Sequence, residues 1–177
     1  TRMPQAATRV QAALPRSPLV ALSAMGRTTN GLFEAAGCAE RGNLVAALDT
    51  LARLRAHHEA TARELCDGVP ELAEAFQELE LVLRGVALLR ELSPRSMDAI
   101  ASFGERLSTR IFAAFTGAAW VDARTVLRTD ARFGEAPPDA AAIHDLARTH
   151  LRPLLTPGRA VVTQGYIGAT RDGLTTT

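Results

Sequence analysis

The feature that most constrains the fold is the alternation of short apolar runs with long stretches of helical spacing. The runs Leu19–Leu22, Ala118–Val121 and Ala160–Val162 are typical of buried parallel strands, and Thr125–Leu127 is predicted as a further short strand. Helical stretches lie before and between these runs. This order of elements predicts an α/β domain with a mainly parallel sheet.

Most of the chain between residues 43 and 116 has helical periodicity, with leucines recurring at three- and four-residue spacing. Gly68 and Pro70 separate the first two helices of this stretch, and Ser93-Pro94 is a typical start for a third. We expect one domain over residues 1–177, with these helices as an insertion at about 43–116. Three consecutive helices without a strand would equally suit a freestanding helical protein.

Two further helices are predicted outside this stretch. Residues 1–14 have helical spacing, which ends at Pro15 and Pro18. Asp139–Leu151 is amphipathic, and Asp139 is well placed to cap its first turn.

Composition narrows the classes of function. The formal net charge of +1 favours neither nucleic acid nor an anionic membrane as a partner. Every basic residue is Arg, which excludes lysine-dependent catalysis by this chain. Cys38 and Cys66 lack metal-ligand spacing, and the adjacent pair His57-His58 points to different helix faces, so no metal site is expected. No apolar run is long enough to span a bilayer, and we expect a soluble, cytoplasmic protein with reduced thiols.

A small polar loop, Ser23 to Asn30, follows the first predicted strand. Loops at the carboxyl ends of parallel strands are where open α/β sheets bind ligands. The hydroxyls of Ser23 and Thr29 could hold a carboxylate or a phosphate oxygen. The alternative is structural, because at least one hydroxyl of the set Ser23, Thr28 and Thr29 could simply cap the following helix.

Glu105 is the second candidate for a ligand-binding residue. It follows Gly104 between two apolar helical stretches, Met97–Phe103 and Leu107–Phe115. A carboxylate at this place could bind an ammonium group through a charge-assisted hydrogen bond. It could equally be an acid in the first turn of a helix, stabilised there by the helix dipole.

Two polar segments near the C-terminal end carry weaker signals. The charges of Asp122, Arg124, Arg128, Asp130 and Arg132 alternate, which indicates local ion pairs or a solvated face, although Asp122 and Arg128 could brace a loop near the site. Glycines at positions 165, 168 and 173 would let a backbone approach a ligand closely. No Gly-x-x-x-x-Gly-Lys or Gly-x-Gly-x-x-Gly motif occurs, so a nucleotide site of those types is excluded.

Four segments of the chain match the motifs of one known family. They are Ser23-Ala-Met-Gly-Arg-Thr-Thr-Asn30, Gly104-Glu-Arg-Leu-Ser-Thr109, the stretch from Asp122 to Gly134, and Thr163-Gln-Gly-Tyr-Ile-Gly168. In this order they resemble the catalytic domain of aspartate kinase, which belongs to the amino-acid kinase family. The similarity spans essentially the whole chain, with Tyr166 in place of the family's Phe.

The resemblance implies a three-layer α/β/α sandwich, incomplete in this chain, with the regulatory domains absent. It implies transfer of the γ-phosphoryl group of Mg-ATP to the side-chain carboxylate of L-aspartate, the first step of lysine, methionine and threonine biosynthesis. L-aspartate and ATP would be the ligands, and the intact enzyme would be a homo-oligomer. Ser23, Thr29 and Glu105 would bind aspartate, with Glu105 at its ammonium group.

The chain departs from the family pattern at both ends. The family has a Lys-Phe-Gly-Gly-Thr-Ser segment before its first helix and a Gly-Arg-Gly-Gly-Ser-Asp loop after the segment matched by Gly173–Thr177, and this sequence contains neither. We therefore expect the chain to hold no catalytic residue of its own and to be inactive alone. Two alternatives stay open, namely another acyl-phosphate-forming amino-acid kinase, such as one acting on glutamate, and a non-catalytic ligand-binding half-domain.

Overall fold

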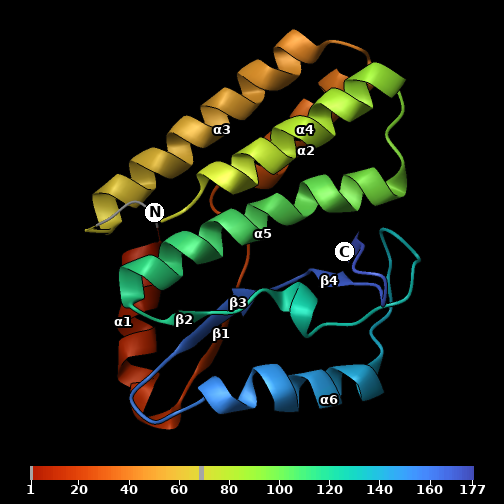
Figure 1. The fold of residues 1–177 in the computed structure, drawn as a ribbon. Coiled ribbons are helices and arrows are strands. Elements are labelled where there is room, and N and C mark those ends of the chain that lie inside the picture. Colours follow the sequence, from red (N-terminus) through yellow and green to blue (C-terminus); the bar gives the residue numbers. More distant parts are fainter. Residues whose placement is uncertain (1, 68–69) are drawn as a thin grey trace.

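The computed structural model describes residues 2–67 and 70–177, and Figure 1 shows their arrangement. Gly68, at which we placed one helix boundary, lies outside these residues. In chain order the elements are α1 (Met3–Ala13), η1 (Leu14–Arg16), β1 (Leu19–Leu22), α2 (Thr28–Glu40), α3 (Leu44–Leu65), α4 (Ala73–Leu89), α5 (Pro94–Thr116), β2 (Ala119–Trp120), η2 (Ala123–Thr125), α6 (Ala140–His150), η3 (Arg152–Leu154), β3 (Val161–Gln164), β4 (Gly168–Ala169) and β5 (Thr175–Thr176).

The strands β1, β2 and β3 form one parallel sheet. Of these three strands β3 is the last in the sequence, but it lies between the other two. Leu19 of β1 and Ala119 of β2 both pair with Val161, from opposite sides. The predicted α/β class and parallel sheet are therefore confirmed. Because the three strands run in one direction, their carboxyl ends meet at a single edge of the sheet.

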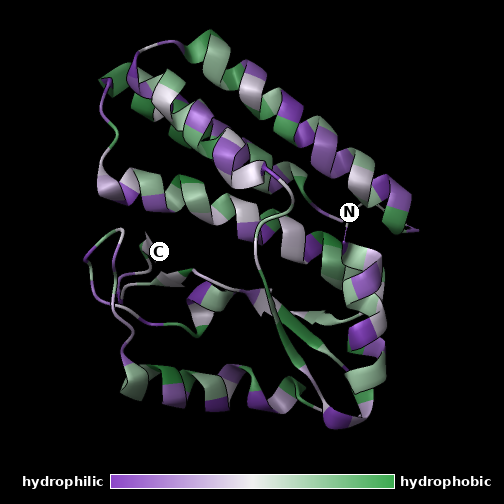
Figure 2. Ribbon diagram, turned by 180° about the vertical axis from the view of Figure 1, so that it is seen from behind, coloured by the Kyte–Doolittle hydropathy of each residue, from purple (hydrophilic) through white to green (hydrophobic). Residues whose placement is uncertain are grey.

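Helices cover both faces of this sheet, with α5 across one face and α6 along the other (Figure 1). On the α5 side, Val162 joins a core that includes residues of α2, α3, α4 and α5. On the other side, Val161 packs with Leu146 and Leu151 of the α6 segment. Neighbouring strand residues point to opposite faces, so two adjacent valines serve two separate cores. In Figure 2 the strands are accordingly mostly hydrophobic, whereas α3 carries many hydrophilic residues.

The starts of α5 and α6 carry the capping residues that the sequence predicts. Ser93 caps α5, since its hydroxyl accepts the Ser96 amide at 3.2 Å and Pro94 occupies the first turn. Asp139 caps α6 by accepting the Ala142 amide at 3.1 Å. Among the residues that the structure describes, no helix is both long and apolar enough to cross a membrane.

The predicted strand at Thr125–Leu127 is wrong. The chain instead turns in η2, because the Asp122 carboxylate accepts the Arg124 amide at 3.0 Å and the Gln164 side chain accepts the Ala123 amide at 2.6 Å. These two bonds satisfy the backbone locally and stop it from extending into a ladder.

A second, antiparallel pair of strands, β4 and β5, was not predicted. Gly168 pairs with Thr176 across it. A Cβ atom at Gly168 would lie 2.8 Å from the Leu127 carbonyl oxygen, so glycine is what allows β4 to lie against the segment after η2. Gly168 therefore allows the β4–β5 hairpin to pack, whereas the sequence had suggested a role at the end of β3.

Candidate functional site

The carboxyl ends of the three parallel strands are joined to one helix, α5. The loop after β1 begins at Ser23, η2 follows β2, and Gln164 ends β3. Side chains of α5 bond to the loop after β1, to Trp120 of β2 and to Gln164 of β3. This edge of the sheet is therefore the candidate site, with α5 as its common support.

The loop after β1 approaches α5 most closely at Gly104. A Cβ atom at this position would lie 2.8 Å from the Ala24 Cβ and 3.5 Å from a Leu32 methyl carbon. Glycine inside a helix costs about 1 kcal/mol relative to alanine. Here it permits the close approach of the loop, and it places the next residue, Glu105, directly at the loop backbone.

Glu105 lies in the middle of α5 and is 7% exposed. The interpretation of Glu105 as a first-turn acid is therefore wrong, because α5 continues through Gly104 without a break. The Glu105 Oε1 atom accepts the Ala24 amide at 3.1 Å. Burial raises the pKa of the Glu105 carboxyl above its ordinary value, and the Ala24 amide opposes this rise. A cationic partner would strongly stabilise the charged form of such a buried carboxylate.

Ser23 and Thr29 flank the same loop, but the structure relates them to Glu105 differently. Ser23 is exposed and precedes Ala24, the residue whose amide Glu105 holds. Thr29 is half-buried in the first turn of α2. The structural alternative, in which one of these hydroxyls caps α2, is wrong, since Arg27 occupies the cap position without a side-chain bond and the Thr28 hydroxyl donates to the Met25 carbonyl at 2.6 Å.

A buried hydrogen-bond network joins α5 to the ends of β2 and β3. The Gln164 amide group donates to the Thr109 hydroxyl oxygen at 2.8 Å, and the Trp120 indole donates to the same oxygen at 3.0 Å. The other end of Gln164 accepts the Ala123 amide. Gln164 is 1% exposed and Thr109 fully buried, so this network fixes the strand ends rigidly against the helix.

The N-terminal part of α5 holds the C-terminal hairpin through Asp98. Its carboxylate accepts the amides of Gly134 at 2.9 Å and Thr177 at 3.0 Å, and it also accepts the Thr177 hydroxyl. Asp98 is 3% exposed. Its position is two helical turns from Glu105, on the same face of the helix.

The alternating charges after β2 make local ion pairs and also brace the loop. Arg124 donates to both oxygens of the Asp122 carboxylate and to the Thr175 hydroxyl, the latter at 3.1 Å. Burial alone would raise the pKa of Asp122, but the bonds and charge of Arg124 outweigh it and hold the pKa below its ordinary value. Arg128 donates to the Thr170 carbonyl at 3.0 Å. Asp122 and Arg128 thus act on the loop and hairpin beside the site.

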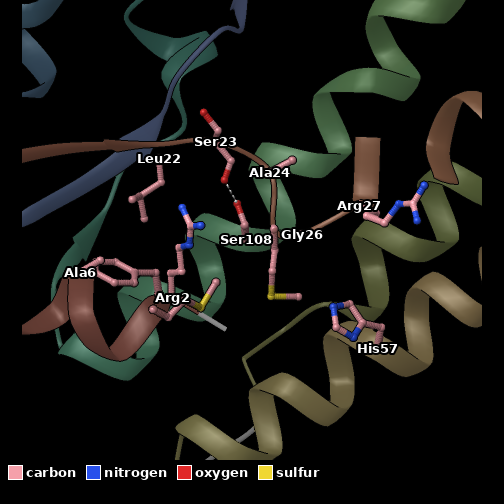
Figure 3. Close-up of a pocket in the computed structure, with 12 residues that line it drawn as sticks. Arg2, Ala6, Leu22, Ser23, Ala24, Gly26, Arg27, His57 and Ser108 are labelled. Carbon is pink, nitrogen blue, oxygen red and sulfur yellow. Dashed lines mark hydrogen bonds between the residues drawn. The ribbon is translucent and has the colours of Figure 1, made fainter. Parts of the chain in front are cut away.

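A cavity of about 870 Å³ lies beside the loop after β1 (Figure 3). Its lining includes Arg2, Ser23, Arg27, His57 and Ser108, but neither Glu105 nor Thr29. In Figure 3 the Ser23 carbonyl faces Ser108, and the Ser23 hydroxyl lies on the opposite side of the backbone. The cavity therefore borders Ser23 but not the other two predicted binding residues, Thr29 and Glu105, and we base the candidate site on the predicted groups.

Pattern reasoning missed Ser108 and Gln164, which the structure places at the centre of this site. Ser108 is 1% exposed and bonds the Ser23 carbonyl, and Gln164 joins two strand ends. Each lies within one of the segments that match the family motifs, but sequence spacing alone does not reveal a bond across the fold. In the part of the chain described, no three His, Cys, Asp or Glu side chains gather where they could hold a metal ion, so we assign no metal ligand.

Replacing Gly104 with alanine is expected to destabilise the protein by about 1–3 kcal/mol, because the new methyl group must push the loop away from α5. Gly85 of α4 is a matched control, since a Cβ atom there meets nothing within 4 Å. Gly85→Ala should instead stabilise the protein by up to about 1 kcal/mol. Urea unfolding of both variants provides the comparison, and equal effects would contradict the close approach at Gly104.

Comparison with known proteins places this fold in a family. The model described as "Amino acid kinase family" matches residues 2–176. "Lysine-sensitive aspartokinase 3" of Escherichia coli is 36% identical over 169 residues, which cover 90% of this chain and 36% of that protein. "Aspartokinase 3, chloroplastic" of Arabidopsis thaliana is 41% identical over 117 residues, which cover 64% of this chain and 21% of that protein.

Solved structures give the same result. E. coli aspartokinase III in complex with aspartate and ADP matches 99% of this chain with a TM-score of 0.82 and 34% identity, over 39% of its own length. The same enzyme in complex with lysine and aspartate matches with a TM-score of 0.72. The matched part of the chain thus spans between 21% and 41% of the length of these relatives. With a family model that covers nearly all of its residues, the chain belongs to the amino acid kinase family.

Proposed function

We propose that this chain is part of an aspartate kinase, which transfers the γ-phosphoryl group of Mg-ATP to the side-chain carboxylate of L-aspartate. In this reaction a carboxylate oxygen forms a bond to the γ-phosphorus, and the bond from that phosphorus to the ADP oxygen breaks. The products are 4-phospho-L-aspartate and ADP. The reaction would open the biosynthesis of lysine, methionine and threonine.

One observation carries the proposal: a buried carboxylate with a raised pKa, Glu105, stands at the loop after β1 in a chain of aspartokinase fold. Among the described residues Glu105 forms no ion pair, and a buried acid of this kind is suited to receive the ammonium group of an amino acid. The E. coli structure that matches nearly the whole chain contains aspartate and ADP, which supports this choice of ligands.

Within the proposed site, Glu105 binds the ammonium group of aspartate. Ser23, which is exposed at the carboxyl end of β1, and Thr29, in the first turn of α2, supply hydroxyls for its carboxylates. Phosphoryl transfer needs charge neutralisation around the moving group, which bound Mg²⁺ and cationic side chains supply. We assign no residue of this chain to that task, so we expect the chain alone to bind aspartate without turnover.

The test is ADP release by a full-length protein that carries this chain, with Mg-ATP and either L-aspartate, L-glutamate or no amino acid. We expect release that depends strongly on L-aspartate, and none from the 177-residue chain alone. Dependence on L-glutamate would instead identify another amino-acid kinase. Release independent of both would overturn the proposal in favour of a ligand-binding half-domain.

The apparent KM for L-aspartate is expected to rise as the pH falls through the raised pKa of Glu105. Protonation removes the negative charge that pairs with the ammonium group, and burial places this loss at a higher pH than for an ordinary glutamate. Steady-state kinetics over a pH series give the profile, with the KM for ATP as the internal control. A parallel rise of both KM values would contradict the role of Glu105.

A further inference from the structure

The peptide unit between Ser23 and Ala24 is held at both of its polar ends by one turn of α5. Its carbonyl oxygen accepts the Ser108 hydroxyl at 2.9 Å, and its N–H group donates to the Glu105 carboxylate at 3.1 Å. In a trans peptide these two groups point in opposite directions, so Ser108 and Glu105 hydrogen-bond to opposite edges of the same peptide unit. Rotation of this peptide would break both bonds together.

The contact of Ser108 with the loop is not a by-product of helix geometry. A serine in a helix commonly donates back to a carbonyl of its own preceding turn, and Ser108 does lie 3.2 Å from the Glu105 carbonyl. Its contact with Ser23 is the shorter one, however, and spans 85 positions of sequence. Ser102, another fully buried serine of α5, donates to the Ala99 carbonyl of its own helix at 2.7 Å.

We propose that Ser108 is a positioning residue, which fixes the Ser23–Ala24 peptide so that the Ser23 hydroxyl and the Glu105 carboxylate keep the orientation that binds the substrate. Ser108 and Ser23 both border the cavity, but Ser108 is 1% exposed and its hydroxyl is bonded to the Ser23 carbonyl (Figure 3). It therefore acts through the backbone and does not touch the substrate. The consequence for catalysis rests on the proposed function, but the positioning itself does not.

Loss of the Ser108 hydroxyl removes the hydrogen bond to the peptide carbonyl. The peptide can then rotate, which weakens the hydrogen bond from the Ala24 amide to Glu105. The Ala24 amide is the backbone donor from the loop that holds the pKa of Glu105 down against burial, and the Glu105 amide is the other donor. A peptide that turns away from Glu105 therefore raises the pKa of its carboxyl further.

The decisive experiment is an NMR titration of the Glu105 side-chain carboxyl carbon in the 177-residue chain, compared between Ser108→Ala and Ser102→Ala. We expect the pKa of Glu105 to rise in Ser108→Ala and to stay unchanged in Ser102→Ala. If a buried serine contributed only to the stability of the fold, the two substitutions would change the pKa of Glu105 by the same amount. An unchanged pKa in Ser108→Ala, with the fold intact, would overturn the proposal whatever reaction the protein catalyses.

The kinetic counterpart uses the full-length protein that carries this chain. Ser108→Ala should raise the KM for L-aspartate about five- to tenfold, the effect of losing about 1 kcal/mol, and leave the KM for ATP unchanged. A shifted pKa without a kinetic effect would leave the positioning intact and contradict its role in aspartate binding. Absence of aspartate-dependent activity in the unaltered protein would contradict only the proposed function.

Discussion

Replacing Glu105 with glutamine is expected to raise the KM for L-aspartate roughly ten- to hundredfold and to leave the fold intact. A charge-assisted hydrogen bond is stronger than a neutral one by an amount that corresponds to this range. The glutamine oxygen can still accept the Ala24 amide, so the loop keeps its support. Steady-state kinetics of a full-length protein that carries this chain measure the effect, and near-normal aspartate kinetics would exclude the assigned role.

The same substitution has a second expected result, on stability. Because the pKa of Glu105 is raised in the folded protein, the contribution of this group to stability is fully present below its unfolded pKa and is lost as the pH rises through the folded pKa. A neutral glutamine avoids this loss. At neutral pH the melting temperature of Glu105→Gln should therefore equal or exceed that of the unaltered protein, and a clear decrease would show that the charge stabilises the fold.

Removal of the Asp98 carboxylate is the second change for which we expect a large effect. Asp98→Ala should destabilise the protein by roughly 2–3 kcal/mol, because one buried acceptor serves two backbone amides and a hydroxyl. The loss falls on the contact between α5 and the C-terminal hairpin. Urea unfolding measures the change in free energy, and hydrogen exchange at the amide of Thr177 should accelerate.

Asp145→Ala is the matched control for this prediction. Asp145 is exposed on α6, and its backbone carbonyl, which accepts the Thr149 hydroxyl, survives the substitution. Its effect should stay within about 0.5 kcal/mol. Equal effects of the two substitutions would show that Asp98 does not anchor the hairpin.

The parts of the fold that local chemistry determines were predictable from the sequence. The strand at Leu19–Leu22 is an apolar run that follows two prolines, and the starts of α5 and α6 carry the capping residues Ser93 and Asp139. The strand expected at Thr125–Leu127 failed because a distant side chain, Gln164, satisfies the backbone there. The position of β3 between β1 and β2 is likewise a long-range property that periodicity does not encode.

The site was predictable in its members but not in its geometry. Glu105 was misplaced at a helix start, because the buried face of α5 bears Asp98, Ser102 and Thr109 instead of an unbroken apolar stripe. These polar residues are tolerated there because each finds a partner. The roles of Ser23, Thr29 and Glu105 toward aspartate remain predictions that the proposed kinetics test.

The order of the strands also has a consequence for how the protein is made. Helices α2 to α5 are consecutive, and their mutual contacts can form while the chain is still being synthesised. The strands β1 and β2 do not pair with each other, and both wait for β3, which is synthesised after them. A nascent chain should therefore hold a helical intermediate with an unassembled sheet, and closure of the sheet should be the slow folding step.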